Sequence, residues 1–139
     1  MLSNCTISEN TASNHGGGFE FVNSTATITN CSITDNHVSF YGGGCYVSNS
    51  SPIFTNCTIA ENSASRGGGL DCNSASLPVL ENCILWNDTP EEIHTIGGAH
   101  VTVSYSNVDG GWEGEGNIDA DPDFRSVGPL AWLLGPGSP

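Results

Sequence analysis

The sequence predicts an all-β fold: a right-handed parallel β-helix (a solenoid) of about four coils of roughly 26 residues, with three short strands in each coil. Two observations predict it. Several sequence marks recur together at one fixed spacing, and the apolar residues between them alternate with polar ones. The fixed spacing indicates a repeat architecture, and the alternation indicates strands rather than helices.

An Asn-Cys pair is the most regular mark. It begins at Asn4, Asn30, Asn56 and Asn82, and Ile or Leu follows the cysteine two residues later. A further asparagine follows in the first three repeats (Asn10, Asn36 and Asn62), whereas Asn87 comes one position early in the fourth. Because asparagine tolerates a left-handed backbone, we expect the first asparagine of each repeat to form a bend and to bond through its amide to the next coil. The cysteines should form an inward column of small apolar groups.

Glycine triplets divide each coil into strands. They lie at 16–18, 42–44 and 67–69, with a weaker Gly97-Gly98 in the fourth repeat. Glycine allows a sharp turn because it has no Cβ. We expect one strand after each triplet, a second around Ile28, Phe54 or Leu80, and a third at the Cys-x-Ile segment. Strands of successive coils would stack at roughly 4.8 Å.

The strength of the pattern predicts two regions: regular coils over residues 1–87, then an irregular final coil with an acidic loop and a truncated tail over 88–139. No N-terminal segment has the basic and apolar parts of a signal peptide. No run approaches the ~20 apolar residues that span a bilayer. Because the pattern is interrupted at both ends, we expect a fragment whose export signal and anchor lie elsewhere.

The composition limits the possible functions. The 139 residues include 15 acidic ones, no lysine, and arginine only at Arg66 and Arg125, which gives a formal net charge of −13. Such a surface repels phosphate backbones and anionic membranes, so we expect no nucleic-acid partner and no membrane docking. The six cysteines could indicate disulfides. Cysteines stacked one coil apart would point their Cβ atoms the same way, however, which favours buried thiols.

The repeat resembles a known family. The segment Ile7-x-x-Asn10, followed by Gly16-Gly17-Gly18-Phe19, and its two later copies are similar to the repeat of polymorphic outer membrane proteins. Residues 105–122 and the final Pro136-Gly137-Ser138-Pro139 are similar to the closing coils of large bacterial β-helix proteins, including choice-of-anchor surface proteins. The resemblance implies the β-helix fold and an extracellular or outer-membrane surface location in bacteria. It implies no catalytic residues, since that family shares none.

The outward face after the glycine turns carries the most distinctive side chains. Glu20, Tyr46 and Asp71 should stack in an exposed column, beside a rim formed by His15, Tyr41 and Arg66. Long repeating faces suit extended ligands, so we expect a non-catalytic module that binds glycans or surface proteins through these six residues. A structural stalk with an ordinary solvated strand face is an alternative.

A further alternative is a fragment of a carbohydrate-active enzyme, either a polysaccharide lyase or a glycoside hydrolase. Glu20 and Asp71 would lie two coils apart, at about 9.6 Å, near the upper limit for the two carboxylates of inverting glycosidases. Tyr46 between them could stack against a sugar. A lyase would have only Arg66 as a nearby cation.

The acidic residues gather late in the chain. Clustered carboxylates between glycines suit Ca²⁺, so we expect calcium at Asp119, Asp121 and Asp123, where it would pin the final coil; a solvated loop is the alternative. His94 and His100 lack partners at zinc spacing and are assigned no metal. Because both ends of a β-helix expose unpaired strand edges, we also expect end-to-end self-association.

Overall fold

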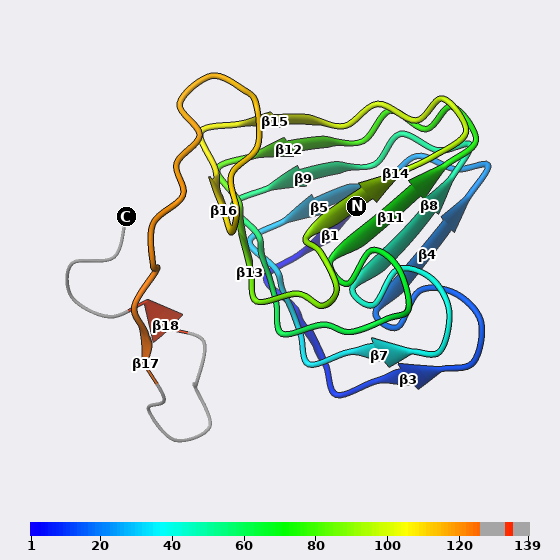
Figure 1. The fold of residues 1–139 in the computed structure, drawn as a ribbon, viewed down its shortest axis with the longest axis horizontal. Coiled ribbons are helices and arrows are strands. Elements are labelled where there is room, and N and C mark those ends of the chain that lie inside the picture. The colour runs from blue at the N-terminus through cyan, green and yellow to red at the C-terminus, as the bar shows by residue number, and fades with distance from the viewer. Residues whose placement is uncertain (126–132, 135–139) are drawn as a thin grey trace.

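The computed structural model describes residues 1–125 and 133–134, and it arranges three parallel sheets around one stack of coils (Figure 1). The first sheet contains β1 (Leu2–Ser3), β5 (Thr27–Thr29), β9 (Ile53–Thr55), β12 (Val79–Glu81) and β15 (Thr102–Ser104). The second contains β2 (Thr6–Ser8), β6 (Ser32–Thr34), β10 (Thr58–Ala60), β13 (Ile84–Trp86) and β16 (Asn107–Val108). The third contains β4 (Phe19–Val22), β8 (Cys45–Ser48), β11 (Leu70–Asn73) and β14 (Ile93–Thr95).

Two smaller pairings complete the strands. β3 (Thr11–Ala12) pairs in parallel with β7 (His37–Val38), and β17 (Phe124–Arg125) pairs in antiparallel with β18 (Leu133–Leu134). Within the described residues there is no helix, and so none that could cross a membrane. The predicted all-β parallel solenoid of about four coils is confirmed. Its parallel pairing continues beyond residue 87, through β14, β15 and β16.

The register of the sheets reproduces the repeat of the sequence. One column of paired residues runs through the first sheet: Leu2, Ile28, Phe54, Leu80 and Val103. Another runs through the second sheet: Ile7, Ile33, Ile59, Leu85 and Val108. Successive side chains of a strand point to opposite faces, so each column turns inward as a unit and builds the core. In the middle coils these side chains are fully buried.

The Asn-Cys pairs form the bends between the first and second sheets, as predicted. Asn4, Asn30, Asn56 and Asn82 are all left-handed, with φ of 56°, 53°, 54° and 54°. The amide of Asn30 donates to Asn4 Oδ1 and that of Asn56 to Asn30 Oδ1, both at 3.2 Å. These bonds link the bends of successive coils on the outside of the stack.

The cysteines are free thiols, in agreement with the sequence interpretation. Cys5, in the first coil, is half-buried, and the other five are buried. The thiols of Cys31, Cys57 and Cys83 each donate to the carbonyl oxygen two residues earlier, at 3.3, 3.4 and 3.4 Å. The sulfur atoms therefore pack as small core groups and also hold the bends.

The glycine triplets let successive coils approach closely. A Cβ on Gly43 would lie against the carbonyl oxygen of Gly68 and 2.7 Å from the backbone nitrogen of Ser63. Both are backbone atoms of the next coil, which cannot move aside without breaking the stack. Glycine is therefore required at this position by the spacing between coils.

The Gly97-Gly98 pair is not the fourth copy of this mark, which corrects the sequence interpretation. The backbone N–H of Leu70 donates to the carbonyl oxygen of Glu92 at 2.8 Å. In the next coil, Glu91 and Glu92 therefore lie beside the Gly67–Gly69 turn, at the positions where the repeat predicts glycines. Gly97 instead accepts from the backbone of Ala75, in a turn after β14. The segment before β14 is shorter than its equivalents, and the fixed spacing therefore fails in this coil.

Candidate functional site

The third sheet positions the residues that the sequence singled out. Glu20, Tyr46 and Asp71 occupy paired positions on β4, β8 and β11, and His94 continues the column on β14. His15, Tyr41 and Arg66 form a second row that is joined by parallel bridges. Each residue of this row directly precedes the first glycine of a triplet, whose positive φ turns the chain back over the column.

Aromatic and charged groups pack the two rows against each other. The ring of His15 stacks on those of Tyr46 and Tyr41, with centroid distances of 4.3 and 5.6 Å. The guanidinium of Arg66 lies 4.2 Å from the centroid of the Tyr41 ring, in a cation–π geometry. His15 Nδ1 lies 3.3 Å from Glu20 Oε1. The six predicted residues therefore form one contiguous group, which we call the rim cluster.

The column is not exposed along its length, which corrects the expectation drawn from strand alternation. The side chain of Glu20 is 47% exposed, but Tyr46 is 8% and Asp71 is 0% exposed. The His15 ring covers Tyr46, and the Arg66 side chain covers Asp71. An outward direction on a strand does not give exposure where the preceding turn folds back over that strand. Tyr46 consequently offers no free ring face to a sugar.

Asp71 is the electrostatic centre of the rim cluster. Arg66 donates from Nε to Asp71 Oδ2 at 2.6 Å and from Nη2 to Oδ1 at 3.3 Å. His94 Nδ1 lies 3.4 Å from the same Oδ2. The hydrogen bond with Asp71 raises the pKa of Arg66 above its ordinary value. Because the two charges neutralise each other, Arg66 is already engaged and offers little to an anionic ligand.

Sequence reasoning missed two residues of this region. His94 was not assigned to the column because a spacing of 26 from Asp71 would pass it by. Phe40 lies beside Tyr41, with ring centroids 6.0 Å apart, and is 50% exposed. Its signal in the sequence was weak, since the equivalent positions Asn14 and Ser65 are polar. Phe40 provides the exposed aromatic ring that Tyr46 does not.

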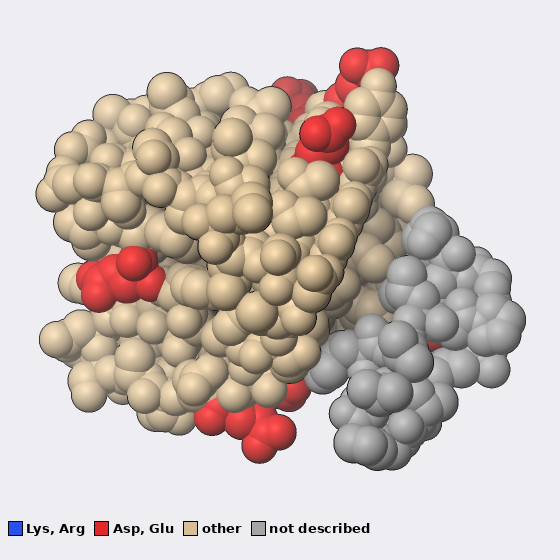
Figure 2. All heavy atoms as spheres, turned by 180° about the vertical axis from the view of Figure 1, so that it is seen from behind, with Lys and Arg blue, Asp and Glu red and all other residues tan. Residues whose placement is uncertain are grey.

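The surface charge is almost entirely acidic. Figure 2 shows a broad face on which carboxylates stand in separate groups towards the edges, with no lysine or arginine in view. Among the side chains that the structure describes, Arg66 is the only Lys or Arg. The molecule therefore presents a polar, uncharged to acidic surface, which disfavours polyanionic ligands.

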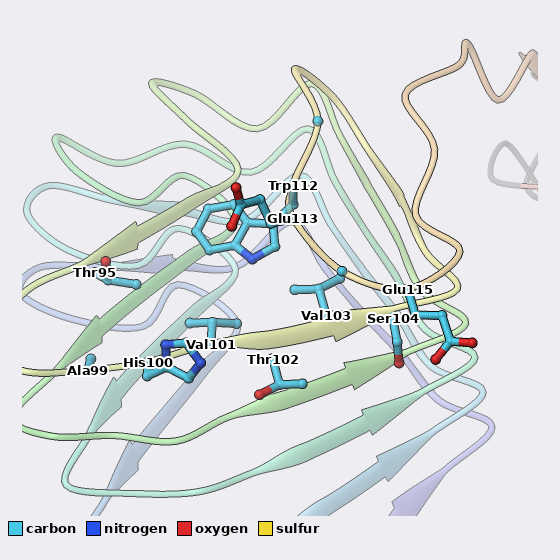
Figure 3. Close-up of a pocket in the computed structure, with 12 residues that line it drawn as sticks. Thr95, Ala99, His100, Val101, Thr102, Val103, Ser104, Trp112, Glu113 and Glu115 are labelled. Atoms are coloured by element: carbon cyan, nitrogen blue, oxygen red, sulfur yellow. The ribbon is translucent and has the colours of Figure 1, made fainter.

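A groove of about 740 Å³ lies at the last coil, between β15 and the loop at residues 111–115. Figure 3 shows Trp112 on the side of β15 to which Val101 and Val103 point, while Thr102 faces the other way. Val101 and Val103 are buried, and Trp112 packs against the same core. The indole therefore closes the apolar interior at this end of the stack, which is a structural role.

The predicted calcium ligands lie after the last coil. Asp119 and Asp121 are exposed, and Asp121 Oδ1 accepts the backbone N–H of Asp123 at 2.9 Å. Across residues 1–125 and 133–134, no three His, Cys, Asp or Glu side chains are arranged to hold a metal ion. Calcium at this loop stays a prediction, and the hydrogen bond gives Asp121 a local role in the turn.

The parallel sheets, the inward apolar columns and the repeated turns define the class of protein as a β-solenoid. The chain matches the family model described as right-handed β-helix region over residues 2–121, and it belongs to that family. No curated protein and no solved structure matches it. The family match supports the fold and its right-handed winding.

Proposed function

We propose that the chain is a non-catalytic binding module of a secreted or cell-surface protein, and that it holds an extended glycan along the rim cluster. The observation that carries the proposal is the half-exposed ring of Phe40 beside Tyr41, with the carboxylate of Glu20 exposed in the same region. Sugars combine apolar C–H faces with hydroxyl groups, so an aromatic ring next to hydrogen-bonding groups suits them.

The repeat supports an extended ligand. His15, Tyr41 and Arg66 occupy one position each on three successive coils, so polar groups recur along the stack at roughly 4.8 Å. A ligand that is itself a repeating chain can make comparable contacts with each coil. A segment of another surface protein is the alternative partner, because its backbone would use the same hydrogen-bonding groups.

A glycan array tests the proposal with the wild-type chain and two variants. Phe40→Ala removes the exposed ring, and we expect about 5- to 10-fold weaker binding, since an aromatic contact is worth roughly 1 kcal/mol. Leu77→Ala is the matched control, because Leu77 is 54% exposed and lies outside the rim cluster. Equal binding by all three proteins would contradict the assigned site. Absence of binding to any glycan would favour a protein partner or a stalk.

The geometry gives less support to catalysis by Glu20 and Asp71. A general acid or base must reach the substrate, but Asp71 has no exposed surface and both of its carboxylate oxygens accept from Arg66. Binding is therefore the function that we propose. Release of sugar from a polysaccharide by the wild type, and its loss in Glu20→Gln, would overturn that choice.

We also propose that the chain self-associates through its first coil. β1, β2 and β4 stand at the edges of their sheets, and Leu2 and Ile7 are only partly buried. Edge strands beside apolar side chains favour pairing with a second chain. Sedimentation over a range of concentrations should show larger species as concentration rises, and a monomer at every concentration would exclude this association.

A further inference from the structure

A second ladder of side chains runs inside the stack, at the turns between the second and third sheets. Asn36 Oδ1 accepts from the backbone N–H and the side-chain amide of Asn10, at 3.1 and 2.9 Å. Asn62 Oδ1 does the same for Asn36, at 3.0 and 3.0 Å. Asn36 and Asn62 are buried. Each asparagine is one rung of this internal ladder: its Oδ1 accepts hydrogen bonds from the previous coil, and its Nδ2 donates one to the next coil.

Asp88 is the fourth rung of this internal ladder, in place of the asparagine that the repeat predicts. Its Oδ1 accepts from the backbone N–H of Asn62 at 2.8 Å and from Asn62 Nδ2 at 2.9 Å. The sequence interpretation assigned the mark to Asn87, one position early. Asn87 instead lies on the outside and donates to Glu61 at 3.1 Å. The carboxylate of an aspartate can accept these hydrogen bonds from the previous coil. It has no amide N–H, however, with which to donate to a fifth residue of the ladder.

Glu92 takes the place of that fifth rung. It belongs to the same coil as Asp88, and its Oε1 accepts the backbone N–H of Asp88 at 3.1 Å. This is the bond that Asp88 Oδ1 makes to the backbone N–H of Asn62 one coil earlier. The fourth coil thus satisfies this backbone N–H with a side chain of its own, so the ladder ends here, although β15 and β16 continue the first and second sheets.

The arrangement leaves two buried oxygen atoms without a hydrogen-bond partner, Asp88 Oδ2 and Glu92 Oε2. The two residues are 6% and 7% exposed. Their other titratable neighbours are acidic: the thiol of Cys45 and the carboxylates of Glu61 and Asp109. Two ionised carboxylates buried side by side without a cation would be strongly unfavourable.

We propose that Asp88 and Glu92 form a proton-binding site, in which one shared proton stands where an asparagine Nδ2–H would donate and thereby closes the internal ladder. The proton joins Asp88 Oδ2 to the Glu92 carboxyl group and removes one of two buried like charges. The internal ladder is therefore complete at the fourth coil only while this proton is bound, which makes the stability of the solenoid sensitive to pH.

The direction of the titration agrees with this geometry. Burial, followed by the interaction with Asp88, raises the pKa of Glu92 to about 10. Burial raises the pKa of Asp88 to about 6. In the unfolded chain both groups ionise near their ordinary values, about 4. A raised folded-state pKa contributes stability that is fully present below the unfolded value and is lost as pH rises through the folded one. The contribution should therefore fall from about pH 4 towards pH 10.

The test compares the pH dependence of unfolding by denaturant in the wild type and in Asp88→Asn. The asparagine supplies an Nδ2–H to an ionised Glu92, so the variant needs no proton. Between pH 6 and 9 we expect the folding constant of the wild type to fall by up to about tenfold per pH unit relative to that of Asp88→Asn. Glu61→Gln, the control, removes a nearby carboxylate outside the ladder and should keep the wild-type slope.

Parallel pH profiles for the wild type and Asp88→Asn would overturn the proposal. So would a rise in wild-type stability on addition of calcium at pH 8 that Asp88→Asn does not show, because the site would then hold a metal cation. If Asp88→Asn does not fold, infrared spectroscopy of the wild type decides. The carbonyl band of a protonated carboxyl group should persist at pH 8, and its absence would rule out the shared proton.

Discussion

The first three coils and the fourth keep the same register with different side chains. In the first three, an asparagine forms each internal rung and a glycine triplet each turn. In the fourth, Asp88 forms the rung, and Glu91 and Glu92 lie against the preceding glycine turn. The strands β14, β15 and β16 nevertheless stay paired with their neighbours. The apolar columns therefore set the register of the strands. The polar residues of the ladder and of the glycine turns differ with the position of each coil in the stack.

The position of a coil explains the difference. A middle coil has a neighbour on both sides, so each rung must accept on one side and donate on the other, which the side-chain amide of asparagine does. The fourth coil is followed by no further rung of the internal ladder, so its side chains must satisfy the remaining backbone groups themselves. Carboxylates are suited to accept those bonds, provided that their charge is compensated.

The largest difference in stability between the middle coils and the fourth coil should come from adding a side chain to a glycine turn. Gly43→Ala places a Cβ against backbone atoms of Gly68 and Ser63, and we expect a loss of about 4 kcal/mol or more in the free energy of unfolding. At Gly98, in the fourth coil, a Cβ would meet nothing within 4 Å, and only its φ of +81° is unfavourable. Gly98→Ala should therefore cost about 1–2 kcal/mol. Denaturant titration measures both, and similar losses would contradict the close approach of the middle coils.

A smaller difference in stability should distinguish the internal ladder from the asparagine hydrogen bonds that link the outer bends. Asn36→Ala removes a buried side-chain amide that bonds the backbone N–H of Asn10, the carbonyl oxygen of Ile7 and the buried Oδ1 of Asn62, and we expect a loss of about 2–4 kcal/mol. Asn30→Ala removes an exposed amide that water replaces. Its cost should be about 1–2 kcal/mol, mainly from the left-handed backbone. Thermal and denaturant unfolding of the pair measure the difference, and equal losses would mean that burial of the ladder contributes nothing.

The smallest effect concerns the region after the last coil. If calcium binds Asp119, Asp121 and Asp123, a chelator should lower the melting temperature of the wild type by a few degrees, because a ligand of the folded state stabilises it. The same treatment of Asp119→Asn should change nothing. A melting temperature of the wild type that is unaffected by chelator would exclude this calcium site. The role of Asp121 would then be its hydrogen bond with the backbone N–H of Asp123.

The sequence predicted most where the repeat is regular. The columns through Ile33 and Ile59, the bends at Asn30 and Asn56 and the thiols follow from residues that recur at equal spacing. It predicted less where a shortened segment changes the spacing between paired residues, as at His94, or where the residue of the internal ladder changes its chemistry, as at Asp88. The composition of the rim cluster could be foreseen from strand alternation. The burial of Tyr46 and Asp71 could not, because it depends on how the glycine turns fold the preceding residues over the strand.

The hydrogen bonds of each coil reach only the coils on either side, and one 26-residue unit contains every mark of the repeat. An in-frame duplication of residues 31–56 would therefore add one full turn and a second copy of Tyr41 and Tyr46. The first coil and the coil closed by Glu92 would be left unchanged. The reach of the contact surface can thus be lengthened by gene duplication without redesign of either end, which lets such a scaffold be matched to ligands of different length.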